Sequence, residues 1–196
     1  MLYKQKGSII IISLIMMILL TIVGLTGIRI SNLEERMSGN FRDHEIAFQA
    51  AEAALSQAEA FVENTTFSTT DFQSGCTGTQ CFTADCTNGL CFDVANFPSS
   101  GPAASSCTNG SDKPWQNWNN WADSSKIRTA TSLNGTKTNA KYMIEFRCFV
   151  VKDDTESNPS TSVFAQWAYS FRITALATGG TDDSQVMLQT TYKKVE

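Results

Sequence analysis

An unbroken apolar run lies near the start of the chain. Residues 8–28 carry no charged side chain and are rich in Ile, Leu and Met. A helix rises about 1.5 Å per residue, so this run would cover roughly 30 Å, the thickness of the hydrocarbon core of a bilayer. The helix has no polar face, which predicts that it lies in lipid or in a bundle of similar helices.

A second helical pattern follows without a break. Phe41, Phe48, Leu55 and Val62 recur every seven residues and form an apolar stripe. Other members of the stripe stand three or four positions away: Ile30, Met37, Ala51 and Ala58. We expect one continuous helix over about residues 8–63, roughly 80 Å long. Its second half should pack on its own domain as an amphipathic helix, and its glycines are points where it could bend: Gly24, Gly27 and Gly39.

Hydrophobic and polar residues alternate with period two near the end of the chain. Residues 141–151, 163–179 and 184–195 each show this alternation, and residues 179–183 read as a turn between the last two. The pattern predicts a half-buried antiparallel sheet. One face of the first strand should hold its apolar residues: Tyr142, Ile144, Phe146, Cys148 and Val150.

Residues 65–138 lack long apolar periods and read as loop-rich. Within them Trp115, Trp118 and Trp121 stand three apart, which in a short helix places them near one face. They are either a lid that packs on the core or a binding platform for a sugar or a partner. The lid is the favoured interpretation, because aromatic side chains more often fill cores.

All cysteines follow the apolar run: Cys76, Cys81, Cys86, Cys91, Cys107 and Cys148. An even number beyond a membrane segment predicts disulfides in an oxidising compartment. Fifteen pairings are open, although Cys148 should reach inward to Cys107 or to the cysteine-rich loop. The spacing lacks the Cys-x2-Cys pairs of common zinc sites and His44 lies far away, so no metal is expected.

The charge distribution indicates the orientation of the chain in a membrane, and the net charge and the motif search argue against several functions. Lys4 and Lys6 precede the apolar run and only Arg29 follows it closely, which favours a cytoplasmic N-terminus and a chain that leads outward. The net charge of −4 argues against nucleic-acid binding as the main role. No catalytic or phosphate-binding motif is recognisable, so we expect neither an enzyme nor a cofactor.

A short basic leader that ends in glycine, an uninterrupted helix and then a sheet together resemble the type IV pilins. More closely, "NLEERMSGNFRDHEIAFQAAEAALSQAE" (residues 32–59) resembles the conserved region of the PilX minor pilins. "YSFRITALATGGTDDSQVMLQTTY" (residues 169–192) is similar to the closing hairpin of that family. Residues 65–140 carry no motif that matches.

The resemblance implies an α+β type IV pilin fold, in which a long N-terminal helix packs on an antiparallel sheet beside a disulfide-rich loop region. It implies a leader over residues 1–7, a transmembrane and filament-core half over 8–28, an amphipathic half over 29–63 and a headgroup over 64–196. In the headgroup, 65–140 would be a variable cysteine-rich region and 141–196 the sheet. A prepilin peptidase would cut between Gly7 and Ser8, and Ser8 would be N-methylated.

By the same resemblance, the function is that of a structural minor pilin. It would help to initiate pilus assembly and form part of the tip complex, supporting adhesion and twitching motility. Its partners would be other minor pilins, the major pilin, the prepilin peptidase, a tip adhesin and the membrane, crossed once. It would reside in the bacterial inner membrane with the headgroup in the periplasm, and later at the pilus tip.

Two residues depart from the usual pilin pattern. The mature chain would begin with Ser8 in place of Phe or Met, and Ile12 occupies the fifth mature position, where pilins usually carry Glu. That glutamate is thought to pair with the N-terminal amine of a neighbouring subunit. A subunit at the very tip has no neighbour above it, so Ile12 favours a place at or near the tip.

Three other functions fit the same sequence. A minor pseudopilin of a type II secretion system shares the anchor and can also lack the glutamate. A periplasmic binding protein, receptor or enzyme on an uncleaved anchor would keep Met1. Finally, the cysteine-rich middle with its three tryptophans could have an adhesive role of its own.

Overall fold

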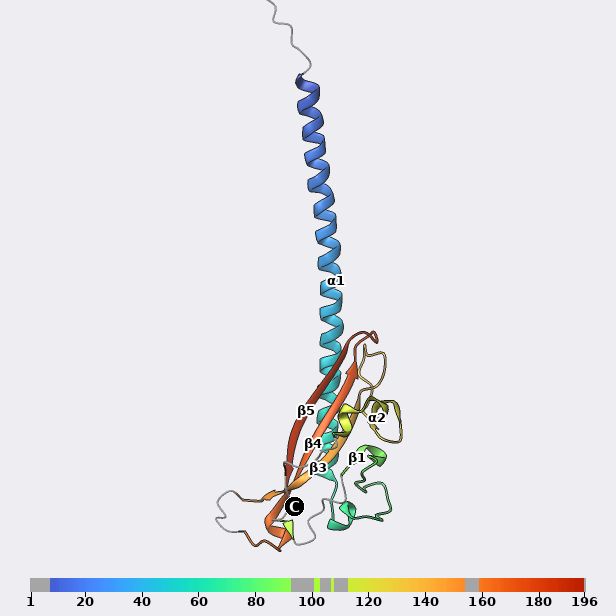
Figure 1. Ribbon diagram of the computed structural model, residues 1–196, viewed down its shortest axis with the longest axis vertical. Helices are drawn as coiled ribbons and strands as arrows, with labels where there is room; N and C mark the ends of the chain where they lie inside the picture. The colour runs from blue at the N-terminus through green and yellow to red at the C-terminus, as the bar shows by residue number, and fades with distance from the viewer. Residues whose placement is uncertain (1–7, 93–100, 103–106, 108–112, 154–158, 196) are drawn as a thin grey trace, which may run out of the picture. The chain divides into compact units, whose positions relative to one another are not determined.

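A computed structural model describes residues 8–92, 101–102, 107, 113–153 and 159–195 (Figure 1). The chain divides into two compact units, residues 1–42 and residues 43–196. Helix α1 (Ser8–Asn64) contributes to both. Its length confirms the expected continuous helix, and none of its three glycines interrupts it.

In the first unit, the side chains of α1 are exposed. Ile12, Leu19 and Ile28 are 57%, 52% and 61% exposed, and so are the later stripe residues Met37 (64%) and Phe41 (73%). The expectation that the stripe packs on its own domain from Ile30 onward is therefore wrong for its first part.

In the second unit, α1 buries a face made mostly of alanine. The residues of this face are 0–2% exposed: Ala47, Ala50, Ala51, Ala54, Ala58 and Val62. Phe48 and Leu55 are partly buried at its margin. Small side chains let the helix backbone come close to the sheet, where larger residues from the strands fill the space. The helix contacts the same core as Phe146, Phe171 and Ile173.

The sheet has three long strands and two short ones. β3 (Lys141–Val151), β4 (Trp167–Thr178) and β5 (Gln185–Lys194) are antiparallel neighbours, as expected. β1 (Leu90–Cys91) pairs in parallel with the outer side of β3, giving the order β1-β3-β4-β5, and β2 (Arg128–Thr129) pairs antiparallel with β3. The sheet is therefore mixed, because a cysteine-rich loop adds the short parallel strand. Residues 164–166, expected to belong to the strand over residues 163–179, form instead the 3-10 turn η6 (Phe164–Gln166).

A β-bulge in β3 changes which residues face the helix. The register shifts between Phe146 and Cys148, so that Phe146 pairs with Phe171 but Cys148 pairs with Ser170. Because of the extra residue, Arg147, each later side chain of β3 points to the opposite face of the sheet from the one that strict alternation predicts. The prediction that Cys148 shares the face of Phe146 is wrong: Phe149 takes that place in the core.

The face of the sheet opposite α1 is covered by the loop region. A second, smaller core there joins six buried residues: Cys86, Cys91, Trp121, Ile127, Met143 and Leu176. The short elements of the loop region are η1 (Thr69–Phe72), η2 (Thr87–Gly89), η5 (Pro114–Gln116) and α2 (Trp118–Ala122). Of these, η1 lies on the side of α1, because its Phe72 packs against Phe146 in the main core. The sheet thus has α1 and the residues around η1 on one face and a loop layer on the other.

Three disulfides join the cysteines, as expected for an exported domain. Cys76 pairs with Cys81 and Cys86 with Cys91, each across five residues, while Cys107 pairs with Cys148 across 41. The first two close small local loops. The third ties the loop layer to β3, and in the chain-entropy view such a long loop contributes the most stability, about 4 kcal/mol.

Candidate functional site

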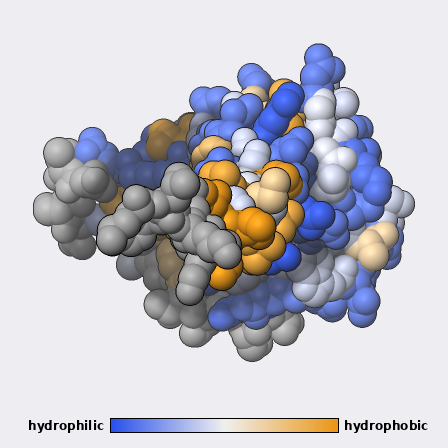
Figure 2. Space-filling view, turned by 90° about the horizontal axis from the view of Figure 1, so that it is seen from above, coloured by the Kyte–Doolittle hydropathy of each residue, from blue (hydrophilic) through white to orange (hydrophobic). Residues whose placement is uncertain are grey.

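The largest uncovered apolar surface is the first half of α1. Ile, Leu, Met and Val side chains of residues 9–28 are 49–73% exposed, and the space-filling view shows hydrophobic residues uncovered (Figure 2). By length and composition this helix can cross a membrane. An apolar surface of this extent in water is unfavourable, so lipid or other apolar helices must cover it.

The few polar side chains in this segment are satisfied by the helix itself. Ser13 donates to Ile10 O (2.9 Å), Thr21 donates to Ile18 O (2.8 Å), and Thr26 donates to Ile22 O. Each hydroxyl bonds to a carbonyl one turn earlier, so it presents no unpaired donor to a hydrocarbon environment. Ile12 lies on the same apolar helix, whereas Gly7 lies outside the described residues.

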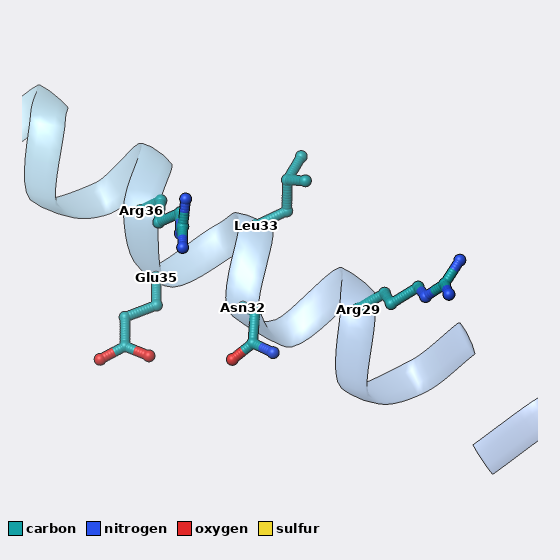
Figure 3. Close-up of a pocket in the computed structure, with 5 residues that line it drawn as sticks. All are labelled: Arg29, Asn32, Leu33, Glu35 and Arg36. Atoms are coloured by element: carbon teal, nitrogen blue, oxygen red, sulfur yellow. The ribbon is translucent and has the colours of Figure 1, made fainter. Parts of the chain in front are cut away.

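The charged side chains that follow do not form a binding site. Arg29, Asn32, Leu33, Glu35 and Arg36 line a shallow surface on α1. Figure 3 shows them pointing in several directions around one helix, without a common centre. A ligand site needs convergent groups that remove the ligand from water, so this surface has the character of a solvated helix segment.

At the start of the packed half of α1, Asp43 binds the turn between β4 and β5. Its carboxylate accepts hydrogen bonds from Gly180 N (2.5 Å) and Thr181 N (3.3 Å), and from the Thr181 hydroxyl. The Thr181 hydroxyl, followed by the backbone donors, lowers the pKa of Asp43. Gly179 allows the approach, because a Cβ there would lie 2.4 Å from the carboxylate oxygen of Asp43.

At the C-terminal end of α1, β5 contacts the last turn of the helix. Lys194, only 6% exposed, donates to the carbonyls of Val62 (2.9 Å) and Glu63 (2.8 Å). A cation at this position satisfies carbonyls that the helix leaves unpaired and complements its dipole. Beside it, Tyr192 donates to the Glu63 carboxylate (2.6 Å), which together with burial raises the pKa of Tyr192 to about 12.

An ion cluster lies on the face of the sheet opposite α1. Glu145 is 8% exposed and accepts hydrogen bonds from Arg172 (Nε 3.0 Å, Nη2 2.5 Å) and from Arg147 Nη1 (2.5 Å). Arg147 also donates to Cys107 O (2.9 Å), so the cluster fixes the loop layer to the sheet. Sequence reasoning missed it, although an acid between apolar residues of a buried strand is a usable signal.

The three tryptophans are not on one face. Asn117 interrupts the helix and caps α2 by accepting from Asn119 N (3.1 Å). Trp121 is 2% exposed and donates its indole N–H to Trp115 O (2.8 Å), whereas Trp118 is 59% exposed. The lid interpretation therefore describes Trp121 and the partly buried Trp115, which packs against the same small core, whereas Trp118 is a separate surface residue.

The part of the chain that the structure describes holds no candidate metal site. There, no three His, Cys, Asp or Glu side chains are grouped so as to hold a metal ion. The features that do stand out are an apolar helix surface, two attachments between helix and sheet, and a disulfide-linked loop layer.

Comparison with known families gives two matches. The PilX N-terminal model matches residues 6–56, and the model of the type IV pilus assembly protein PilX C-terminal region matches residues 87–194. The second match includes much of the cysteine-rich middle, which the resemblance in the sequence did not reach. Comparisons with curated proteins and with solved structures give no match. The apolar helix, the alanine-faced packing and these matches lead to one conclusion: the chain belongs to the PilX family of type IV pilus assembly proteins.

Proposed function

We propose that this protein is a minor pilin that helps to initiate type IV pilus assembly and forms part of the tip complex, supporting adhesion and motility. PilX-family membership supports a structural role in the pilus. The observation that carries the finer proposal is Ile12, an apolar residue that is 57% exposed in the uncharged first part of α1, residues 8–28.

Charge burial explains why this position matters. Cleavage between Gly7 and Ser8 would leave a positively charged amine at the start of the helix. Burying such an amine among apolar helices is costly unless a carboxylate of a neighbour pairs with it. Ile12 cannot supply that carboxylate, so this subunit cannot neutralise the amine of another subunit placed above it. A subunit at the tip has no subunit above it, so it does not need this carboxylate.

The proposal also covers the membrane topology, the processing and the partners of the protein. The first half of α1 crosses the inner membrane once, with the N-terminus in the cytoplasm and the headgroup in the periplasm, and later joins the filament core. Prepilin peptidase removes residues 1–7 and Ser8 is N-methylated. The partners are the other minor pilins, the major pilin and a tip adhesin.

Position along the filament tests the tip placement. Photocrosslinkers placed at exposed Met37 and immunogold labelling of the headgroup should locate the subunit at one end of each pilus. Ile12→Glu should supply the missing carboxylate and allow the subunit into the shaft, raising its number of copies per pilus severalfold. Ile12→Leu is the matched control and should leave the location unchanged. An even distribution of the unaltered protein along the shaft contradicts the proposal.

Two further measurements separate the alternatives. Mass spectrometry of the mature protein should give a chain that begins at Ser8 with an N-methyl group; a chain that keeps Met1 indicates an uncleaved anchor. Co-purification should recover pilus components, and recovery of secretion-system components alone would indicate a pseudopilin.

A further inference from the structure

A small pocket lies beside Trp118 on the headgroup. It has a volume of about 200 Å³. It is formed by α2, the residues that lead into β3, the end of β4 and the start of β5. Leu176, 9% exposed, contributes an apolar side chain to the lining, and Trp118 stands beside it. Pockets for drug-sized ligands measure about 300–1,000 Å³, so this one accommodates a single ring.

Trp118 is held in its exposed position by its neighbours. Asn120 donates to Pro114 O (2.9 Å), and Lys141 Nζ donates to the carbonyl of Trp121 (2.8 Å). Together with the Asn117 cap and the buried Trp121, these bonds fix α2 at both ends. The backbone that carries Trp118 is therefore fixed before a ligand binds, which lowers the entropy cost of stacking a ligand against the indole.

The polar residues around the indole are neutral amides and hydroxyls. The hydroxyls of Thr138 and Thr178 form a hydrogen bond with each other (2.8 Å) at the margin of the pocket. Asn139 and Gln185 line it as exposed side chains. Among the described residues that line the pocket none is acidic, and the only cation, Lys141, already donates to Trp121 O.

We propose that this pocket binds one neutral hexopyranose unit of a glycan. A pyranose ring has an apolar C–H face that stacks on an indole, and a hydroxyl edge that both donates and accepts hydrogen bonds. Asn139 and Gln185 amides and the threonine hydroxyls can also both donate and accept. An apolar peptide side chain would gain no hydrogen bonds from the Asn139 and Gln185 amides, so these amides favour a sugar as the ligand.

The test uses the full chain in lipid nanodiscs whose lipids carry no sugar. Saturation-transfer NMR with methyl β-D-galactopyranoside, methyl α-D-glucopyranoside and methyl α-D-mannopyranoside should show transfer to ring C–H protons of at least one sugar. Trp118→Ala should weaken binding at least tenfold, and Trp118→Phe should retain part of it. Gln116→Ala is the matched control, because Gln116 is exposed nearby but does not line the pocket.

Folding and competing outcomes are separated by further measurements. If Trp118→Ala does not fold, as judged by circular dichroism, Asn139→Ala carries the test and should weaken binding several-fold. Absence of transfer from all three sugars overturns the proposal, as does binding that Trp118→Ala leaves unchanged. If Trp118→Ala instead abolishes co-purification of another pilus subunit and no sugar binds, the pocket is a protein interface and the proposal is wrong.

This proposal is independent of the tip placement. The sugar experiment concerns the isolated chain and gives no information on filament position. The crosslinking experiment locates the subunit and gives no information on sugars, so failure of one can be told from failure of the other.

Discussion

The two parts of α1 have the same secondary structure and opposite packing. Residues 9–28 carry Ile, Leu and Met side chains that are all at least 49% exposed, whereas residues 47–62 bury a row of alanines at 0–2%. The exposed part is apolar on every side, whereas the packed part is amphipathic. Their apolar side chains also differ in size: bulky ones suit contact with lipid, and small ones let the helix backbone approach a sheet closely.

A charge at the centre of the exposed part should have the largest effect. Leu19→Asp should cost about 3 kcal/mol in membrane insertion, because a carboxylate at the centre of a spanning helix loses its hydration. We expect most of the protein to be lost from the membrane fraction in a fractionation experiment. Leu19→Met is the control and should insert normally. Normal insertion of Leu19→Asp would mean that this segment is not the spanning one.

A larger side chain on the alanine face should have the next largest effect. Ala51→Leu should reduce the free energy of unfolding by about 2 kcal/mol, since the added carbons have no space against the sheet. Chemical denaturation followed by tryptophan fluorescence measures this. Ala60→Leu, on the exposed side of the same helix, should change stability by less than about 0.5 kcal/mol. Equal effects at the two positions would contradict the packing described.

The attachment of β5 to the helix should give the smallest effect, and it should depend on pH. The pKa of Tyr192 is raised to about 12, above about 10 for an unfolded chain, so its hydrogen bond to Glu63 stabilises the fold below pH 10 and is lost as pH rises toward 12. Tyr192→Phe should lower stability by less than about 1 kcal/mol at pH 8.

Thermal unfolding of both proteins at pH 8 and pH 11.5 isolates this bond. The difference in Tm between wild type and Tyr192→Phe should shrink at the higher pH. Other groups titrate in the same range, but they do so in both proteins. A difference that stays constant or grows with pH would exclude the assigned role.

Repeating patterns in the sequence predicted the main elements well. The alternation over residues 141–151 matches the bounds of β3, and β5 differs from its predicted range by one residue at each end. The alternation located these strands although the expectation of a half-buried sheet is wrong for β3 and β4, whose residues are mostly buried on both faces. The continuous helix was equally readable, since no break separates its apolar run from its stripe.

Features that depend on a single residue could not be predicted from the sequence. Arg147 looks like any polar strand residue, yet as a bulge it reverses Cys148 and brings Phe149 into the core. Asn117 divides two short helices and so separates exposed Trp118 from buried Trp121. The Asp43 and Lys194 attachments were also unreadable, because they join residues more than 130 positions apart and no local pattern marks them.

The Lys194 contact has a consequence for the order of folding. The carbonyls of Val62 and Glu63 belong to a segment made early, and their partner lies 132 and 131 residues later in the chain. During synthesis, these two carbonyls therefore lack the Lys194 ammonium until β5 has emerged, whereas those of Ala60 and Phe61 already have donors in Asn64 and Thr65. Non-local contacts of this kind form slowly, so the headgroup reaches its final stability only when its last strand is in place.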